Sequence, residues 1–126
     1  MRGRFSRNVL ALLRDSRMIR IRSGIGDEPH RYTGIWCVVV DERVFVRPWF
    51  DKSSGWRRAF REEPRGAVSV GEREIPVRGR PARGGRLFDA IDDAYAEKYD
   101  TKASLRWVRG FETPRRRKTT LELLPR

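Results

Sequence analysis

Apolar side chains recur along the chain at two spacings, and each spacing predicts a different kind of element. A spacing of three to four residues places side chains on one face of a helix, and a spacing of two places them on one face of a strand. Helical spacing predicts helices over residues 5–14, 56–63 and 86–99, with Ser6 capping the first, and a further helical turn within 101–110.

The helix predicted over residues 86–99 has the clearest separation of apolar and polar faces. Its apolar stripe consists of Leu87, Phe88, Ile91, Ala94, Tyr95 and Lys98. Its polar face, which we expect to contact water, consists of Asp89, Asp92, Asp93 and Glu97. Asp92 and Asp93 diverge by about 100° around the helix axis, so they are expected to be surface residues rather than an acid pair.

Alternating patterns and short apolar runs predict six strands. They cover residues 18–23, 35–40, 44–47, 67–70, 74–80 and 119–124. The run from Ile35 to Val40 is the most apolar of them, which is typical of a central strand that is buried on both faces. Pro76 has no N–H group for a neighbouring strand, so its strand is expected at an edge or a bulge.

The order of these elements predicts an α+β fold. Strands joined mostly as hairpins form an antiparallel sheet, and six strands in a chain of 126 residues avoid open edges most simply by closing into a barrel. This length allows one domain with a sizeable core and not two, so residues 1–126 are expected to form a single domain with flanking helices.

The formal net charge of +12 changes the functional picture. Of the 29 basic residues four are Lys and the remaining 25 are Arg. Arginine presents a forked donor set that suits phosphate, but a GC-rich genome produces the same Arg-for-Lys bias without selection for a ligand. In either case anions will be attracted, and the run Arg115 to Lys118 predicts non-specific binding to nucleic-acid phosphates.

Several classes of site are excluded by composition. The chain has one Cys and one His, which excludes an internal disulfide and a metal site built from a His/Cys cluster. Cys37 lies in the apolar run and is expected to be a buried, inert thiol. No apolar run approaches the roughly 20 residues that a membrane span needs, so a cytoplasmic protein is expected. No residue stands out as a catalytic acid or base.

Several short motifs occur in an order that resembles the split β-barrel flavin-binding superfamily. The resemblance is best to the deazaflavin-dependent nitroreductase-like proteins and to an uncharacterised small-protein branch related to them. It extends over roughly residues 5–124. The matching segments are Arg22-Ser23-Gly24, Arg31-Tyr32-Thr33, Val44-Phe45-Val46-Arg47, Trp56-Arg57-Arg58-Ala59-Phe60, Glu63-Pro64-Arg65-Gly66-Ala67-Val68-Ser69-Val70 and Ala94-Tyr95-Ala96-Glu97-Lys98-Tyr99.

The resemblance implies a homodimer that binds FMN or a deazaflavin in a groove between two barrels, with activity as a reductase. The residues implied to hold the cofactor phosphate are Arg22, Ser23, Arg31 and Thr33. Those implied to border or cover the ring system are Arg47, Lys52, Ser53, Ser54 and Trp56, and Trp49 and Arg57 are further expected cofactor-binding residues. In such a site the protein positions the cofactor and the cofactor supplies the hydride chemistry.

The chain departs from this family in two loops. Asp27, Glu28 and Asp51 stand where the deazaflavin relatives carry basic or glycine-rich segments, and their carboxylates would repel a phosphate. Two alternatives therefore stay open, in which the barrel binds no flavin. One is a cofactor-independent enzyme that acts on a small metabolite, and the other is a basic nucleic-acid-binding module.

Overall fold

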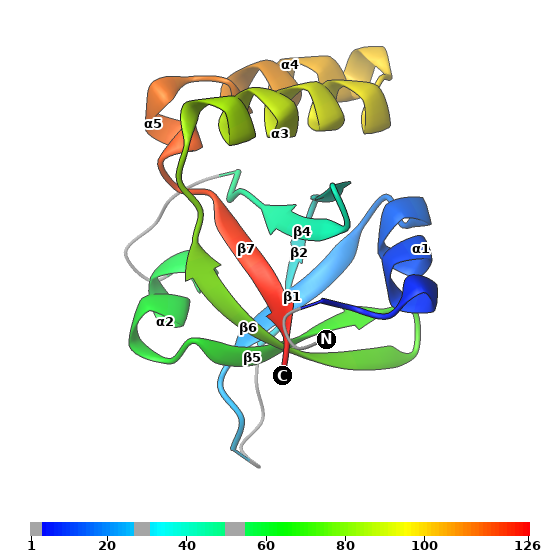
Figure 1. Ribbon diagram of the computed structural model, residues 1–126, viewed down its shortest axis with the longest axis vertical. Helices are drawn as coiled ribbons and strands as arrows, with labels where there is room; N and C mark the ends of the chain where they lie inside the picture. Colours follow the sequence, from blue (N-terminus) through cyan, green and yellow to red (C-terminus); the bar gives the residue numbers. More distant parts are fainter. Residues whose placement is uncertain (1–3, 27–30, 50–54) are drawn as a thin grey trace.

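The computed structural model describes residues 4–26, 31–49 and 55–126, and these ranges contain five helices and seven strands (Figure 1). The helices are α1 (Arg7–Asp15), α2 (Trp56–Glu62), α3 (Gly85–Lys98), α4 (Lys102–Phe111) and α5 (Pro114–Arg117). The strands are β1 (Ile19–Ser23), β2 (Thr33–Ile35), β3 (Cys37–Val40), β4 (Arg43–Val46), β5 (Arg65–Val70), β6 (Arg73–Pro81) and β7 (Leu121–Pro125). The predicted helices and hairpins are confirmed, and Ser6 caps α1 by accepting a hydrogen bond from the Val9 N–H.

The strands form an antiparallel sheet that closes almost completely into a barrel. Their order is β2-β1-β5-β6-β7-β4-β3, so β2 and β3 lie at the two ends of the order although only Trp36 separates them in sequence. Residues 33–40 therefore pair with β1 through their first half and with β4 through their second half. The predicted antiparallel barrel is confirmed, with seven strands instead of six because one predicted strand is interrupted.

The interruption at Trp36 has a local cause. The Trp36 carbonyl oxygen accepts a hydrogen bond of 2.9 Å from the Tyr95 hydroxyl of α3. The indole of Trp36 also stacks on Tyr99, with ring centroids 4.1 Å apart. Trp36 therefore contacts α3 and Tyr99, the residue that follows this helix. It does so at the point where residues 33–40 stop pairing with β1 and begin pairing with β4.

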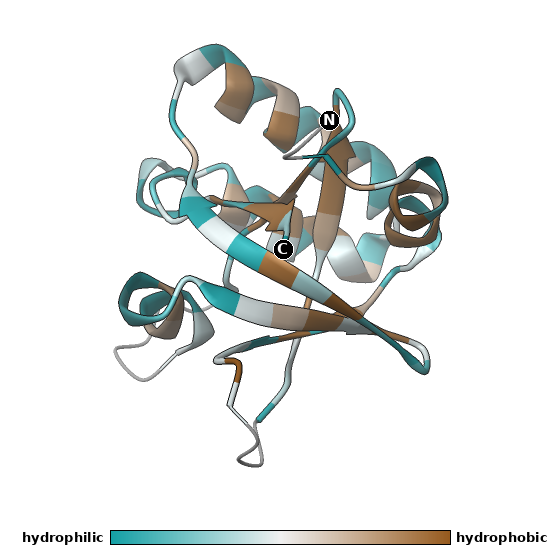
Figure 2. Cartoon of the chain, turned by 60° about the horizontal axis from the view of Figure 1, so that its bottom comes forward, coloured by the Kyte–Doolittle hydropathy of each residue, from teal (hydrophilic) through white to brown (hydrophobic). Residues whose placement is uncertain are grey.

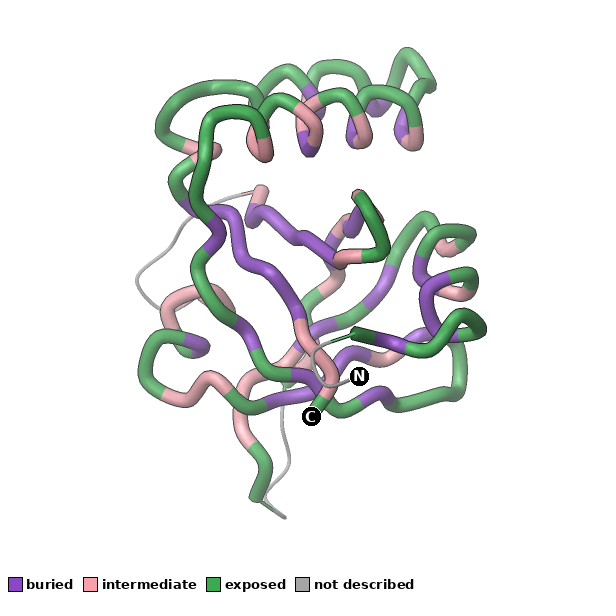
Figure 3. Tube along the Cα trace, in the orientation of Figure 1, coloured by how far each residue is buried: buried purple, intermediate pink, exposed green. Residues whose placement is uncertain are grey.

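Residues 35–40 are buried on both faces, as their apolar run predicts. Ile35 and Cys37 belong to the core inside the barrel, where α1 and Phe60 also pack. Val38 belongs to a second core between the outer face of β3 and β4 and the helices α3 and α4. Figure 3 shows the resulting pattern on α3 and α4, which are exposed on their outer side and buried toward the barrel. Hydrophobic residues concentrate along the strands, and the tips of the hairpins are hydrophilic (Figure 2).

Pro76 lies at a local edge, as predicted. It pairs with Ala67 of β5, but the pairing of β6 with β7 begins only at Val77. Pro76 is exposed and, among the strands that the structure describes, has a ladder neighbour on one side only. Its missing N–H group therefore costs the sheet no hydrogen bond on the β7 side.

The prediction that Asp92 faces water is wrong. Its side chain is 14% exposed and forms ion pairs with the guanidinium groups of Arg47 and Arg117. Arg47 is completely buried, and its Nε donates to the Thr120 hydroxyl at 2.8 Å while its Nη1 donates to Asp92 and to the Phe111 carbonyl. Helical periodicity places Asp92 on the polar face, but α5 and the end of β4 cover that part of the face with cations.

A second buried carboxylate lies on β7. Glu122 is 3% exposed and accepts two hydrogen bonds from Arg43, at 3.0 and 2.9 Å, and two from Arg80, at 3.1 and 2.9 Å. Burial by itself would raise the pKa of Glu122, but the hydrogen bonds from Arg43 and Arg80 outweigh burial and hold this pKa below its usual value. Glu122 thus connects β4, β7 and β6 through charge.

No helix in the described ranges is long and apolar enough to cross a membrane.

We predict that Glu122→Gln lowers the free energy of unfolding by about 2 kcal/mol at pH 7, because it leaves two guanidinium groups without their shared anion. The folded pKa of Glu122 lies below its unfolded value of about 4.3. The carboxylate therefore stabilises the fold above that pH, and the stabilisation disappears as the pH falls through the folded pKa. Urea unfolding at several pH values should show the deficit of the variant shrinking below about pH 4.

The matched control is Glu42→Gln. Glu42 pairs with Arg4 at 2.7 Å, but both side chains are more than half exposed. This substitution should change the free energy of unfolding by no more than about 0.5 kcal/mol. Equal effects of the two substitutions at pH 7 would contradict a structural role for the buried carboxylate.

Candidate functional site

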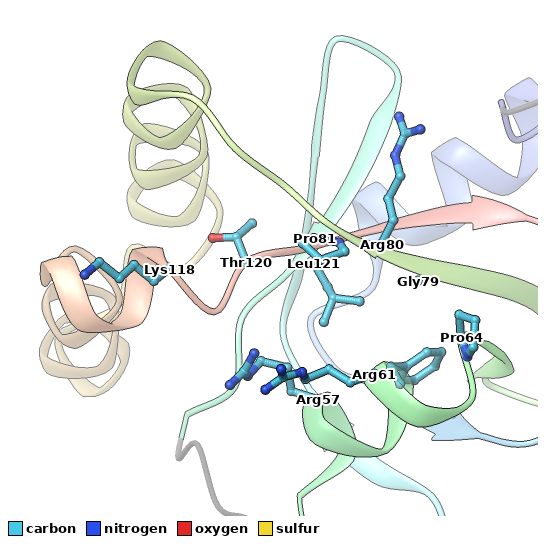
Figure 4. Close-up of a pocket in the computed structure, with 10 residues that line it drawn as sticks. Arg57, Arg61, Pro64, Gly79, Arg80, Pro81, Lys118, Thr120 and Leu121 are labelled. Carbon is cyan, nitrogen blue, oxygen red and sulfur yellow. The ribbon is translucent and has the colours of Figure 1, made fainter.

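A pocket of about 460 Å³ lies between α2, the end of β6 and the start of β7 (Figure 4). Elements that are far apart in sequence form it, because β6 and β7 are neighbours in the sheet and α2 packs against β6. Its lining residues are Arg57, Phe60, Arg61, Pro64, Gly79, Arg80, Pro81, Lys118, Thr120 and Leu121.

The polar part of this pocket is strongly cationic. Four of the lining residues carry a positive charge, and no described lining residue is acidic. Arg57 and Arg61 are one helical turn apart on α2, so their side chains lie beside each other in Figure 4. Arg80 extends away from them toward Glu122, with which it is paired. Neither Arg61 nor Lys118 has a carboxylate partner within the described ranges.

The apolar wall of the pocket depends on two glycines. Phe60 packs over Gly66 and Gly79, where a Cβ atom would lie 2.9 Å from its ring in each case. A Cβ on Gly79 would also lie 2.6 Å from Leu121 Cδ2. Only glycine lets the phenyl ring approach β5 and β6 this closely. Phe60, Pro64 and Leu121 then give the pocket an apolar part beside its cations.

The lining suits binding better than proton transfer. The Thr120 hydroxyl already donates to the Arg117 carbonyl and accepts from Arg47 Nε. Carboxylates and imidazoles are missing from the described lining, so these side chains offer no general base. The arginines and the lysine can donate to phosphate oxygens, while the apolar wall can accept a flat or apolar group.

The residues implied to bind phosphate are not brought to this pocket. Arg22 donates to the Tyr32 hydroxyl at 3.1 Å and pairs with Glu74 at 3.2 Å. The Ser23 hydroxyl donates to the carbonyls of Ala59 and Glu63, which connects β1 to α2. Both side chains therefore hold elements together.

Arg31 and Thr33 are exposed just before and at the start of β2, and neither lines the pocket.

The other residues expected to bind the cofactor are scattered. Arg57 lines the pocket, and Trp56 packs against Phe60 behind it, with ring centroids 6.4 Å apart. For Arg47 the expectation is wrong. Arg47 is completely buried, and its guanidinium donates hydrogen bonds to Thr120, Asp92 and the Phe111 carbonyl, so it cannot border a ligand at the surface.

Trp49 lines a different, smaller pocket beside α4. Lys52, Ser53 and Ser54 lie outside the described residues.

Sequence reasoning missed Arg61, Arg80, Lys118 and Thr120. Arg61 carries a signal that could have been used, because it follows Arg57 by four residues on a predicted helix. Lys118 and Arg80 reach the pocket only through the pairing of β6 with β7, whose register no local pattern specifies.

Cys37 is buried, as predicted, and the hydrogen bonds around it join elements of the fold. Burial raises the pKa of the Cys37 thiol and lowers the pKa of Lys98. The Lys98 ammonium donates to the carbonyls of Leu13 and Cys37, at 3.0 and 2.8 Å. Lys98 thereby satisfies a carbonyl near the end of α1 and links that helix to β3.

Comparison with solved structures establishes the fold. The chain superposes on a conserved hypothetical protein from Mycobacterium tuberculosis, Rv2991, with a TM-score of 0.62 and 12% identity, over 97% of this chain and 80% of that one. It superposes on a putative pyridoxamine 5'-phosphate oxidase from Listeria innocua with a TM-score of 0.58 and 13% identity, over 94% and 90%. For an F420-H2 dependent reductase, FDR-A, the values are 0.57 and 14%, over 86% and 93%.

These likenesses confirm the split β-barrel fold that the motifs predict, and at such low identity they show the fold alone. No curated protein matches the chain in sequence. The sequence profile of one family does match, over residues 9–123, which is nearly the whole chain. The chain therefore belongs to DUF2255, a family described as uncharacterized proteins conserved in bacteria.

Proposed function

We propose that this protein binds a small phosphorylated ligand with a planar ring, of the flavin or deazaflavin type, in the pocket between α2, β6 and β7. The observation that carries the proposal is that one pocket is lined by four cationic side chains and by the apolar residues Phe60, Pro64 and Leu121. When bound, such a cofactor supplies hydride transfer, and the protein would then act as a reductase.

The charges favour a phosphate over a neutral ligand. Arg57 and Arg61 place their guanidinium groups side by side in the pocket (Figure 4), and no described lining residue is acidic. Like charges that lie side by side repel each other, and a phosphate oxygen accepts strong hydrogen bonds from guanidinium groups, so a bound phosphate would offset this repulsion. We assign the phosphate of the ligand to these two side chains.

The size and the apolar wall favour a ring beside that phosphate. About 460 Å³ lies within the range of roughly 300–1,000 Å³ that is typical of small-molecule sites. Phe60, Pro64 and Leu121 offer apolar contacts to the face of a planar group. Two structures with the same fold are named for related chemistry, an F420-H2 dependent reductase and a putative pyridoxamine 5'-phosphate oxidase, which supports a ligand of this class.

We also infer that two copies of the chain pair. The pocket is open to solvent on one side, whereas small-molecule sites commonly bury most of the ligand surface. A second copy placed over the opening would complete the enclosure, as the resemblance to the split-barrel superfamily implies.

The ligand proposal predicts saturable binding of FMN or of a deazaflavin, measured by the change in cofactor fluorescence. Arg57→Gln and Arg61→Gln should each weaken binding by about 10- to 100-fold, because each removes a charged hydrogen bond to phosphate worth about 1.5–3 kcal/mol. Arg109→Gln is the matched control, since Arg109 is exposed on α4 and does not line the pocket.

Failure to bind either cofactor would overturn the flavin assignment. A loss of the same size in all three variants would show that net charge, not the pocket, attracts the ligand. Retention of the protein on short DNA at low salt, with a steep loss as salt rises, would instead favour the nucleic-acid alternative.

Pairing predicts a mass in solution of twice the 14.8 kDa of one chain, measured by light scattering during gel filtration. The ligand should bind with lower affinity when the protein is diluted far enough to dissociate, because separation uncovers the pocket. A monomer at all concentrations, with undiminished affinity, would contradict pairing and leave the ligand assignment intact.

A further inference from the structure

A second pocket, of about 240 Å³, lies beside α4 and shares no residue with the cationic pocket described above. It lies between the chain that follows β4, the second half of α4 and the short helix α5. Its lining residues are Trp49, Arg106, Trp107, Gly110, Phe111 and Arg116.

Two donors on residues that line this pocket are buried and have no acceptor. Trp49 Nε1 and Arg116 Nη1 are both inaccessible to solvent, and no hydrogen-bond partner for either lies within the described structure. Buried polar groups are almost always hydrogen-bonded, and leaving one without a partner costs about 1–3 kcal/mol. Both donors lie on residues that line one pocket, so an acceptor bound there would satisfy them once the two side chains turn toward it.

The charge around these donors specifies the kind of acceptor. Arg106 and Arg116 both line the pocket, and no lining residue in the described ranges is acidic. The guanidinium of Arg106 is held over the ring of Trp107, 5.2 Å from its centroid. An oxyanion would accept from Trp49 Nε1 and Arg116 Nη1 and would be attracted by both arginines.

The remaining walls are aromatic. The rings of Trp49 and Trp107 are 6.2 Å apart and inclined at 41°, and Phe111 is buried beside them. Trp49 is held in turn by Trp36, whose ring meets it edge-on at 5.4 Å and 89°. The rings of Trp36, Trp49 and Trp107 thus already pack against one another without a ligand.

We propose that this pocket is a second binding site, for a small aromatic oxyanion: one ring that bears a carboxylate or a phosphate group. The oxyanion accepts hydrogen bonds from Trp49 and Arg116, and the ring packs against the edges of Trp49 and Trp107 that line the pocket. A volume of about 240 Å³ holds a single ring with its acidic group and excludes a macromolecule. The site does not depend on the flavin-type ligand proposed for the other pocket.

The test uses benzoate and phenyl phosphate as probes and the indole N–H signals of the ¹⁵N-labelled full chain as the readout. Trp49→Phe identifies the Trp49 signal by its disappearance. Both probes should move that signal in a saturable way, because the indole N–H gains an acceptor. Inorganic phosphate and benzyl alcohol, which carry only the oxyanion or only the ring, should bind at least tenfold more weakly.

Arg116→Gln and Arg115→Gln form a matched pair of variants. Arg115 is the preceding residue on α5, is exposed, and does not line the pocket. Arg116→Gln should weaken benzoate binding about tenfold or more, whereas Arg115→Gln should leave it unchanged. Arg61→Gln, which removes a cation of the other pocket, should leave the Trp49 shift unchanged, so failure of one site is distinguishable from failure of the other.

The proposal is overturned if neither probe moves the Trp49 signal up to about 10 mM. It is equally overturned if Arg115→Gln and Arg116→Gln weaken binding to the same extent, which would mean non-specific attraction by charge. If Trp49→Phe fails to fold, the Arg116→Gln and Arg115→Gln proteins retain all four indole signals, and the comparison between them still decides the question.

Discussion

Residues 33–40 pair with β1 through β2 and with β4 through β3, so both ends of the sheet belong to one continuous segment. A shift in the pairing on one side would have to be accommodated on the other within eight residues. Closure in turn fixes β6 against β7, and the cationic pocket lies where these two strands meet α2. The geometry of the pocket therefore depends on the hydrogen bonding of a segment that contributes no lining residue.

The helices outside the barrel are fixed by charge as well as by apolar packing. Asp92 of α3 pairs with Arg47 from the end of β4 and with Arg117 of α5. These ion pairs hold Arg117 in place, and its two neighbours line different pockets. Arg116 lines the second pocket, beside α4, and Lys118 lines the cationic pocket. The basic run Arg115 to Lys118 suggests one continuous surface for nucleic acid, but its side chains lie in different surroundings in the structure.

The sequence predicts what local patterns determine. The apolar stripe of α3, the hairpin of β5 and β6 and the two-sided burial of residues 35–40 follow from periodicity, and the fold follows from the order of motifs. Asp92 was unpredictable from periodicity, because the cations that cover it arrive from other elements. Arg57 was found through a motif, but Arg80 and Lys118 enter the pocket only through strand register.

The abundance of arginine has more than one cause within this chain. At Arg47 the fork itself is required, since Nε and Nη1 reach acceptors on α3, on α4 and on Thr120 just before β7, and a lysine could not replace it. Arg43 donates through both Nε and Nη2 to one carboxylate, which is again specific to a guanidinium. At Arg61, which has no acidic partner within the described ranges, a phosphate would require only positive charge. A compositional bias toward arginine can therefore account for the choice of residue at Arg61, but not at Arg47 or Arg43, where the geometry of the side chain holds the barrel and its helices together.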